Sequence, residues 1–180
     1  VSLTVDAYNL SIIAPTFIAT VLASWLQVGF VGRYAGLVSV GEHSQAAAYR
    51  TKMLALVAII SLAFAAICSL FPGQIIGMLM SSGQESTRTL AADALEIAAW
   101  ILVPILMADF ISLVLNSHGR FFAAAFAPLF NAVVSILGLW LWPAIDLGSL
   151  VLTLLMGAGA QLAFAIWALA RLRLNHTLDM

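Results

Sequence analysis

Polar side chains recur at helical spacing inside long apolar stretches of this sequence, and their types could support binding or proton chemistry. One set repeats at steps of four, four and three residues: Thr16, Thr20, Ser24 and Gln27. Another repeats at steps of three and four: Asp109, Ser112 and Asn116. Residues three or four apart share one face of a helix. Each set therefore indicates a polar stripe along one helix.

Two further apolar stretches carry stripes of the same kind. One holds Pro128, Asn131 and Ser135, and the other holds Ser149, Thr153, Gly157 and Gln161. Polar groups in a membrane segment are costly and by default face the protein interior. One interpretation is a hydrated cavity lined by hydroxyls and amides, including Asn131 and Gln161. The other is dry packing, in which small residues let helices approach closely.

Asp109 is the most informative single residue, because its carboxyl group lies about two helical turns inside an apolar stretch. One interpretation is a proton-coupled role. The other, which the sequence favours, is a structural ion pair with Arg120 or Arg33 near the same end of the spans.

Enzyme chemistry is not expected from the rest of the sequence. It has no metal-ligand spacing, no nucleophile elbow and no phosphate-binding glycine loop, so we predict no catalytic residue, no metal and no cofactor. The net charge of −1 gives no basic field for nucleic acid. Cys68 is the single cysteine and lies in an apolar run, which indicates a structural thiol.

The polar stripes lie on segments that the composition assigns to a membrane. The sequence is 63% hydrophobic and 8% charged, whereas a soluble domain carries about a quarter charged residues. A helical span needs about 20 mainly apolar residues. Five stretches qualify: 10–32, 53–71, 97–115, 121–142 and 147–170. Because backbone in lipid must pair internally, we predict an all-α, polytopic transmembrane bundle.

The basic residues predict an orientation for this bundle. With five spans, one side carries Arg33, Arg50, Lys52, Arg120, Arg171 and Arg173, and the other side carries Arg88. Loops rich in lysine and arginine stay in the cytoplasm. We therefore expect the N-terminus outside and the C-terminus in the cytoplasm.

The turn between the third and fourth spans is the most specific motif. It reads L-N-x-x-x-R-F from Leu115 to Phe121, then A-F-A-P ending at Pro128, and then Asn131. Other anchors precede it in order: Asp6-Ala7-Tyr8 with Pro15, Phe30-Val31 with Tyr34, Gly41-Glu42, and Phe71-Pro72. Together these motifs resemble the MurJ (MviN) family of lipid II flippases, whose superfamily also contains polysaccharide flippases and multidrug extruders.

The resemblance implies a two-lobed helical transporter, of which residues 1–180 would form a partial N-terminal lobe with helices two to six. Such a protein lies in the bacterial cytoplasmic membrane and serves peptidoglycan or polysaccharide synthesis. It moves glycans linked to undecaprenyl pyrophosphate to the outer leaflet by alternating access. Its partners would be this cargo, membrane lipids and a C-terminal lobe. Arg120 would have a structural or gating role, and Pro128 would kink its helix.

One feature departs from the family. The first span has no cation after Pro15, where the family usually carries arginine or another polar residue. A pyrophosphate in a low-dielectric cavity needs a partner, so a different lipid-linked glycan is an alternative cargo. A cation-coupled exporter of small molecules and a non-transporting membrane scaffold are the alternative functions.

Overall fold

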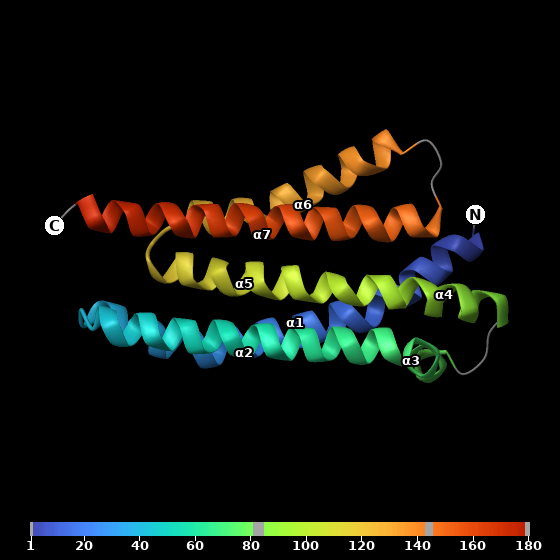
Figure 1. The fold of residues 1–180 in the computed structure, drawn as a ribbon, viewed down its shortest axis with the longest axis horizontal. Helices are drawn as coiled ribbons and strands as arrows, with labels where there is room; N and C mark the ends of the chain where they lie inside the picture. The colour runs from blue at the N-terminus through green and yellow to red at the C-terminus, as the bar shows by residue number, and fades with distance from the viewer. Residues whose placement is uncertain (1, 81–84, 143–145, 179–180) are drawn as a thin grey trace.

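The protein is an elongated bundle of helices that run along a common direction (Figure 1). The computed structural model describes residues 2–80, 85–142 and 146–178, and all regular elements in these ranges are helical. In chain order they are α1 (Ser2–Ser39), α2 (His43–Leu70), α3 (Pro72–Leu79), α4 (Glu85–Ala98), η1 (Ala99–Ile101), α5 (Leu102–Ser117), α6 (Phe121–Leu141) and α7 (Leu147–Leu178). The predicted all-α fold is confirmed.

Five segments are long and apolar enough to cross a membrane, as predicted. They are Val5–Ser39, His43–Leu70, Glu85–Ser117, Phe121–Leu141 and Leu147–Arg171. The third runs through α4, η1 and α5 without a break. The short helix α3 lies across the end of the bundle (Figure 1). Pro72 is at its start, where the missing N–H would have had no helical partner.

Two tight turns reverse the chain at the same end of the bundle. In the turn after α5, the Gly119 N–H donates to the Asn116 carbonyl at 3.0 Å and the Arg120 N–H donates to the Leu115 carbonyl at 3.0 Å. Gly119 has φ +73°, and Gly41 has φ +79° in the equivalent turn after α1. These bonds and angles define a Schellman motif, which requires a left-handed residue after the helix. The polar turn singled out in the sequence is therefore a helix stop.

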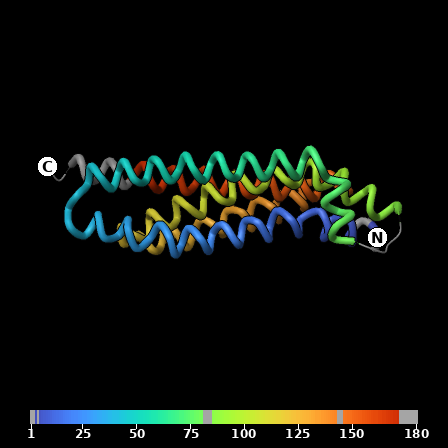
Figure 2. Tube along the Cα trace, turned by 90° about the horizontal axis from the view of Figure 1, so that it is seen from below, coloured from blue at the N-terminus to red at the C-terminus, as the bar shows by residue number. Residues whose placement is uncertain are grey.

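Helix α5 lies in the middle of the bundle and packs on both sides. Figure 1 shows α5 between α7 and α2, and Figure 2 shows α1 and α2 as two edges of the bundle. Leu106, Phe110 and Val114 pack in a core cluster with residues of α1 and α2. Ile111 and Leu115 pack in a second cluster with α6 and α7. The remaining side of α5 carries the polar residues Asp109, Ser112 and Asn116.

Candidate functional site

Three helices meet where Asn131, Gln161 and Asp109 are joined by hydrogen bonds. The Asn131 amide nitrogen Nδ2 donates to Gln161 Oε1 at 3.0 Å. The Gln161 amide nitrogen Nε2 donates to Asp109 Oδ1 at 3.5 Å. Gln161 is buried, while Asp109 and Asn131 are half-buried. The structure thus brings together three predicted site residues from α5, α6 and α7.

The hydrogen-bonded group extends along α6 to Ser135. Its hydroxyl oxygen lies 3.3 Å from Asn131 Oδ1 and 3.3 Å from the Thr153 carbonyl oxygen. Since one hydroxyl has one proton to donate, it bonds one of these acceptors at a time. We call Ser135, Asn131, Gln161 and Asp109 the Asp109 network.

Helix α6 packs closely against α7 next to Ser135 and Asn131 of the Asp109 network. A Cβ atom added at Gly157 would collide with Ser135 Oγ and Asn131 Oδ1, and would lie 2.7 Å from the Asn131 carbonyl oxygen. At Gly138, a Cβ atom would lie 2.7 Å from Thr153 Cγ2. Small residues at these positions let two helices come close in a membrane. The stripe on α7 therefore serves packing at Gly157 and hydrogen bonding at Gln161.

The expected ion pair of Asp109 with Arg120 or Arg33 does not form among the described residues. Arg33 instead lies over the ring of Tyr49, with the guanidinium carbon 5.0 Å from the ring centroid. Arg120 is exposed and precedes the first residue of α6. The partner of Asp109 is the neutral amide of Gln161, which the spacing within one helix could not have revealed.

The polar set on α1 is separate from the Asp109 network. Thr16, Thr20, Ser24 and Gln27 are all exposed. The three hydroxyls donate to carbonyls of their own helix: Thr16 to Ile12 at 2.6 Å, Thr20 to Thr16 at 2.8 Å, and Ser24 to Thr20 at 2.8 Å. The four residues of the predicted stripe share one side of α1, and none of the other described helices covers that side.

The remaining predicted residues lie on α5 and α6, the helices that carry Asp109 and Asn131, or in the turn between them. Ser112 and Asn116 are half-buried on the Asp109 side of α5, as their spacing predicted. Pro128 lies inside α6, exposed, less than one turn before Asn131. A proline there removes one helix hydrogen bond. The predicted roles of these residues and of Arg120 stay predictions.

An aromatic cluster at one end of the bundle was missed by the sequence reasoning. Phe30 and Tyr34 are buried and stack with ring centroids 4.8 Å apart, and Phe30 also contacts Tyr49 at 5.5 Å and Phe110 at 4.7 Å. The Tyr34 ring lies 5.7 Å from His118. The four-residue spacing of Phe30 and Tyr34 was the signal that could have revealed a shared buried face.

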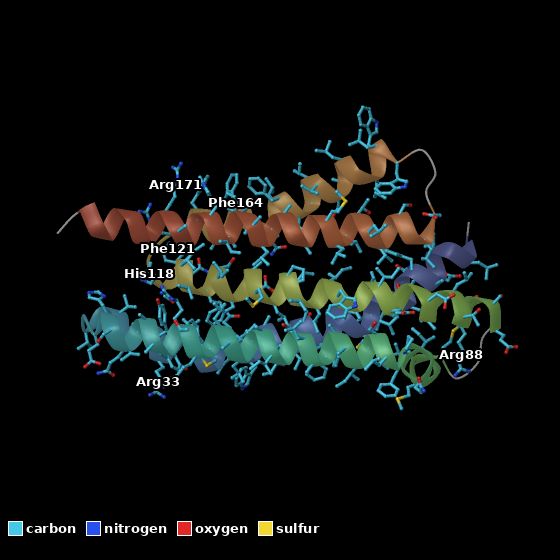
Figure 3. All side chains as sticks on the ribbon, viewed as in Figure 1. Arg33, Arg88, His118, Phe121, Phe164 and Arg171 are labelled. Carbon is cyan, nitrogen blue, oxygen red and sulfur yellow. The ribbon has the colours of Figure 1, made fainter. Side chains whose placement is uncertain are left out.

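Basic side chains are distributed unevenly between the two ends. Figure 3 shows Arg33, His118 and Arg171 toward one end and Arg88 at the opposite end. The Arg171 guanidinium carbon lies 4.5 Å from the centroid of the Trp167 ring, within the range of a cation–π contact. The arrangement agrees with the alternation of loops that the sequence predicted.

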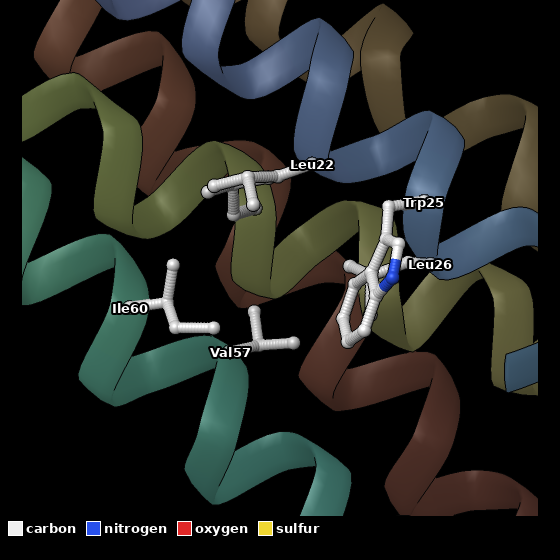
Figure 4. Close-up of a pocket in the computed structure, with 6 residues that line it drawn as sticks. Leu22, Trp25, Leu26, Val57 and Ile60 are labelled. Carbon is white, nitrogen blue, oxygen red and sulfur yellow. The ribbon is translucent and has the colours of Figure 1, made fainter. Parts of the chain in front are cut away.

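A small apolar pocket between α1, α2 and α5 is shown in Figure 4. It is lined by Leu22, Trp25, Leu26, Val57, Ile60 and Leu106. Its volume is about 10 Å³, near the lower limit for a single water molecule. It is too small for a glycan head group. Within the described ranges, no group of three or more His, Cys, Asp or Glu side chains could hold a metal ion.

Comparisons with known proteins identify the family. The sequence profile of the lipid II flippase MurJ family matches residues 1–179. A probable lipid II flippase MurJ of Thermotoga maritima is 28% identical over 139 residues, which cover 76% of this chain and 28% of that protein. The chain thus spans little more than a quarter of that relative's length. No solved structure matches the chain. Since the profile covers nearly every residue, this chain belongs to the lipid II flippase MurJ family.

Proposed function

We propose that the full-length protein moves a lipid-linked glycan precursor of the lipid II type from the cytoplasmic to the outer leaflet of the bacterial cytoplasmic membrane. The observation that carries the proposal is the family match over residues 1–179. Five apolar helices suit a polytopic transporter. The protein would act without catalysis, and its product would feed peptidoglycan or polysaccharide synthesis. The family match does not favour the exporter or the scaffold.

This segment would form part of the N-terminal lobe, and a second lobe would face it across the transport pathway. The exposed polar stripe on α1 supports this arrangement, because Thr16, Thr20, Ser24 and Gln27 would then line the pathway. Asp109, Ser112 and Asn116 would contribute from α5. A cationic partner for the pyrophosphate would come from other parts of the protein, because residues 10–32 of the first span carry no cation and Arg33 lies over the Tyr49 ring.

The orientation follows from the charges. The end with Arg33, Arg50, Lys52, Arg120 and Arg171 would face the cytoplasm, since basic loops are retained there. The chain would then begin outside. Arg120, at the start of α6, would have a structural or gating role at the cytoplasmic surface.

Depletion of the protein in its own cells tests the proposal. We expect lipid-linked glycan to accumulate with its head group inaccessible to a reagent that labels only the outer surface. Re-expression of the full-length protein should restore labelling. A second flippase in the same cells is excluded first by depleting each candidate gene in turn. Unchanged outer labelling after depletion of this protein would then contradict the proposed function.

A further inference from the structure

The hydrogen bonds of the Asp109 network can form a series that ends at the Asp109 carboxyl group. Asn131 donates to Gln161, Gln161 donates to Asp109, and Ser135 donates either to Asn131 or to the Thr153 carbonyl. Hydrogen bonds in such a series polarise one another, and the effect is largest where water is excluded. The Asp109 carboxyl group is therefore the final acceptor of this series of hydrogen bonds.

We propose that Gln161 and Asn131 are positioning residues that hold Asp109 as the acceptor for hydroxyl or ammonium groups of the glycan head group. The proposal rests on the proposed function. Asp109 would bind the hydroxyl or ammonium groups of the cargo, and other residues would bind its pyrophosphate. Gln161 is buried and acts through Asp109, whereas Asp109 is half-buried and keeps acceptor capacity.

The chemistry of a carboxylate supports this division of the cargo. An ionised carboxylate accepts hydrogen bonds at two oxygens and donates none, so it suits hydroxyl and ammonium groups. It repels a pyrophosphate, and no cation among the described residues forms an ion pair with Asp109 to offset that repulsion. Only Oδ1 receives a hydrogen bond within the described residues, from Gln161.

Helix packing alone does not account for a charged residue here. Gly138 and Gly157 already bring α6 and α7 together, and Ile111 and Leu115 already pack α5 in the same core cluster as α6 and α7. The oxygen of a neutral amide at position 109 could also accept the Gln161 hydrogen bond. The carboxyl group adds a charge that the packing does not require.

Two variants of the full-length protein separate positioning from packing. Asp109→Asn keeps an oxygen that can accept from Gln161 but removes the charge. Gln161→Leu removes the donor and keeps the carboxyl group. Ser61→Ala is the matched control, because Ser61 is fully buried in α2 and bonds only its own helix, to Ala58 at 3.1 Å. Thermal unfolding of each purified variant establishes that it folds.

Binding is measured for two probes, undecaprenyl pyrophosphate with and without its glycan. We expect Asp109→Asn and Gln161→Leu to bind the glycan-bearing lipid about tenfold more weakly, the size expected when a charge-assisted hydrogen bond is lost. Binding of the sugar-free lipid should stay unchanged, and Ser61→Ala should bind both lipids as the unsubstituted protein does.

Three results would overturn the proposal. They are unchanged binding of the glycan lipid by both variants, an equal loss for both lipids, and an Asp109→Asn variant that binds normally while Gln161→Leu does not. The last two would identify a purely structural network. If the unsubstituted protein binds the glycan lipid but does not move it, the proposed function fails, and the binding comparison still decides the role of the network.

Discussion

Gly157 is the residue on which the contact between α6 and α7 depends most directly. Ser135 and Asn131 occupy the space that a side chain at this position would need. Gly159, two residues away on the same helix, has no atom within 4 Å of an added Cβ. The two glycines therefore offer a matched pair, one inside the contact and one outside it.

We expect Gly157→Val to lower the free energy of unfolding by about 1–3 kcal/mol, the usual cost of overpacking. Gly159→Val should keep or raise stability, because an added Cβ meets no atom within 4 Å there and valine is a slightly better helix former than glycine. Thermal unfolding of the full-length protein in detergent measures both. Equal unfolding temperatures for the two variants would show that the close contact is absent.

Asp146 caps the start of α7. Its Oδ1 accepts the Ser149 backbone N–H at 2.8 Å, and its own backbone N–H donates to Ser149 Oγ at 3.0 Å. This reciprocal pair satisfies two N–H groups at the helix start. The hydrogen bonds from Ser149 hold the pKa of the Asp146 carboxyl below its ordinary value.

The lowered pKa predicts how the cap responds to acid. A group with a depressed folded-state pKa stabilises the fold above its unfolded pKa, and this contribution is lost as the pH falls through the folded pKa. We expect hydrogen exchange at the start of α7 to accelerate in that acidic range. Asp146→Asn should exchange at a rate independent of pH there, after correction for intrinsic exchange. An unchanged acid response in Asp146→Asn would refute the assignment.

At the scale of elements, hydropathy located the spans but not the helix ends. The predicted span 53–71 became α2, which begins at His43, and the predicted span 97–115 became a helical segment that begins at Glu85. The added turns are polar and rich in good helix formers, so they continue the helix outside the apolar stretch. Hydropathy reports contact with lipid, whereas helix ends depend on stops such as Gly41 and Gly119.

The candidate site shows the same limit. Spacing correctly placed Asp109, Ser112 and Asn116 on one side of α5, because they belong to one helix. It could not show that Gln161 reaches Asp109 across 52 positions, or that Asn131 reaches Gln161 across 30. Such contacts depend on which helices are neighbours. The exposure of Thr16, Thr20, Ser24 and Gln27 likewise depends on what covers α1.

The turn between α5 and α6 gives a prediction at this scale. Gly119 adopts φ +73°, where a residue with a Cβ atom costs about 1 kcal/mol or more. We expect Gly119→Ala to destabilise the protein by about that amount. Gly36→Ala in α1 is the control, since Gly36 has open space at its Cβ position and no positive φ. Chemical denaturation that ranks Gly36→Ala as the less stable variant would contradict the helix-stop assignment.

At the scale of the whole molecule, the two ends of the bundle should face opposite sides of the membrane. Gln45 lies near the start of α2 and Arg88 lies in α4, at opposite ends and both exposed. In a Cys68→Ala background, we expect Arg88→Cys to react with an impermeant thiol reagent in intact cells. Gln45→Cys should react only after permeabilisation. The reverse pattern would invert the proposed orientation.

Translocation by the purified full-length protein tests the central claim most directly. The protein is reconstituted in vesicles with a fluorescent lipid-linked glycan, and head groups are quenched from one side. We predict that the protected fraction falls faster than in vesicles without protein, because the protein carries head groups across the bilayer. A protected fraction that decays at the protein-free rate, in vesicles shown to contain folded protein, would contradict the account.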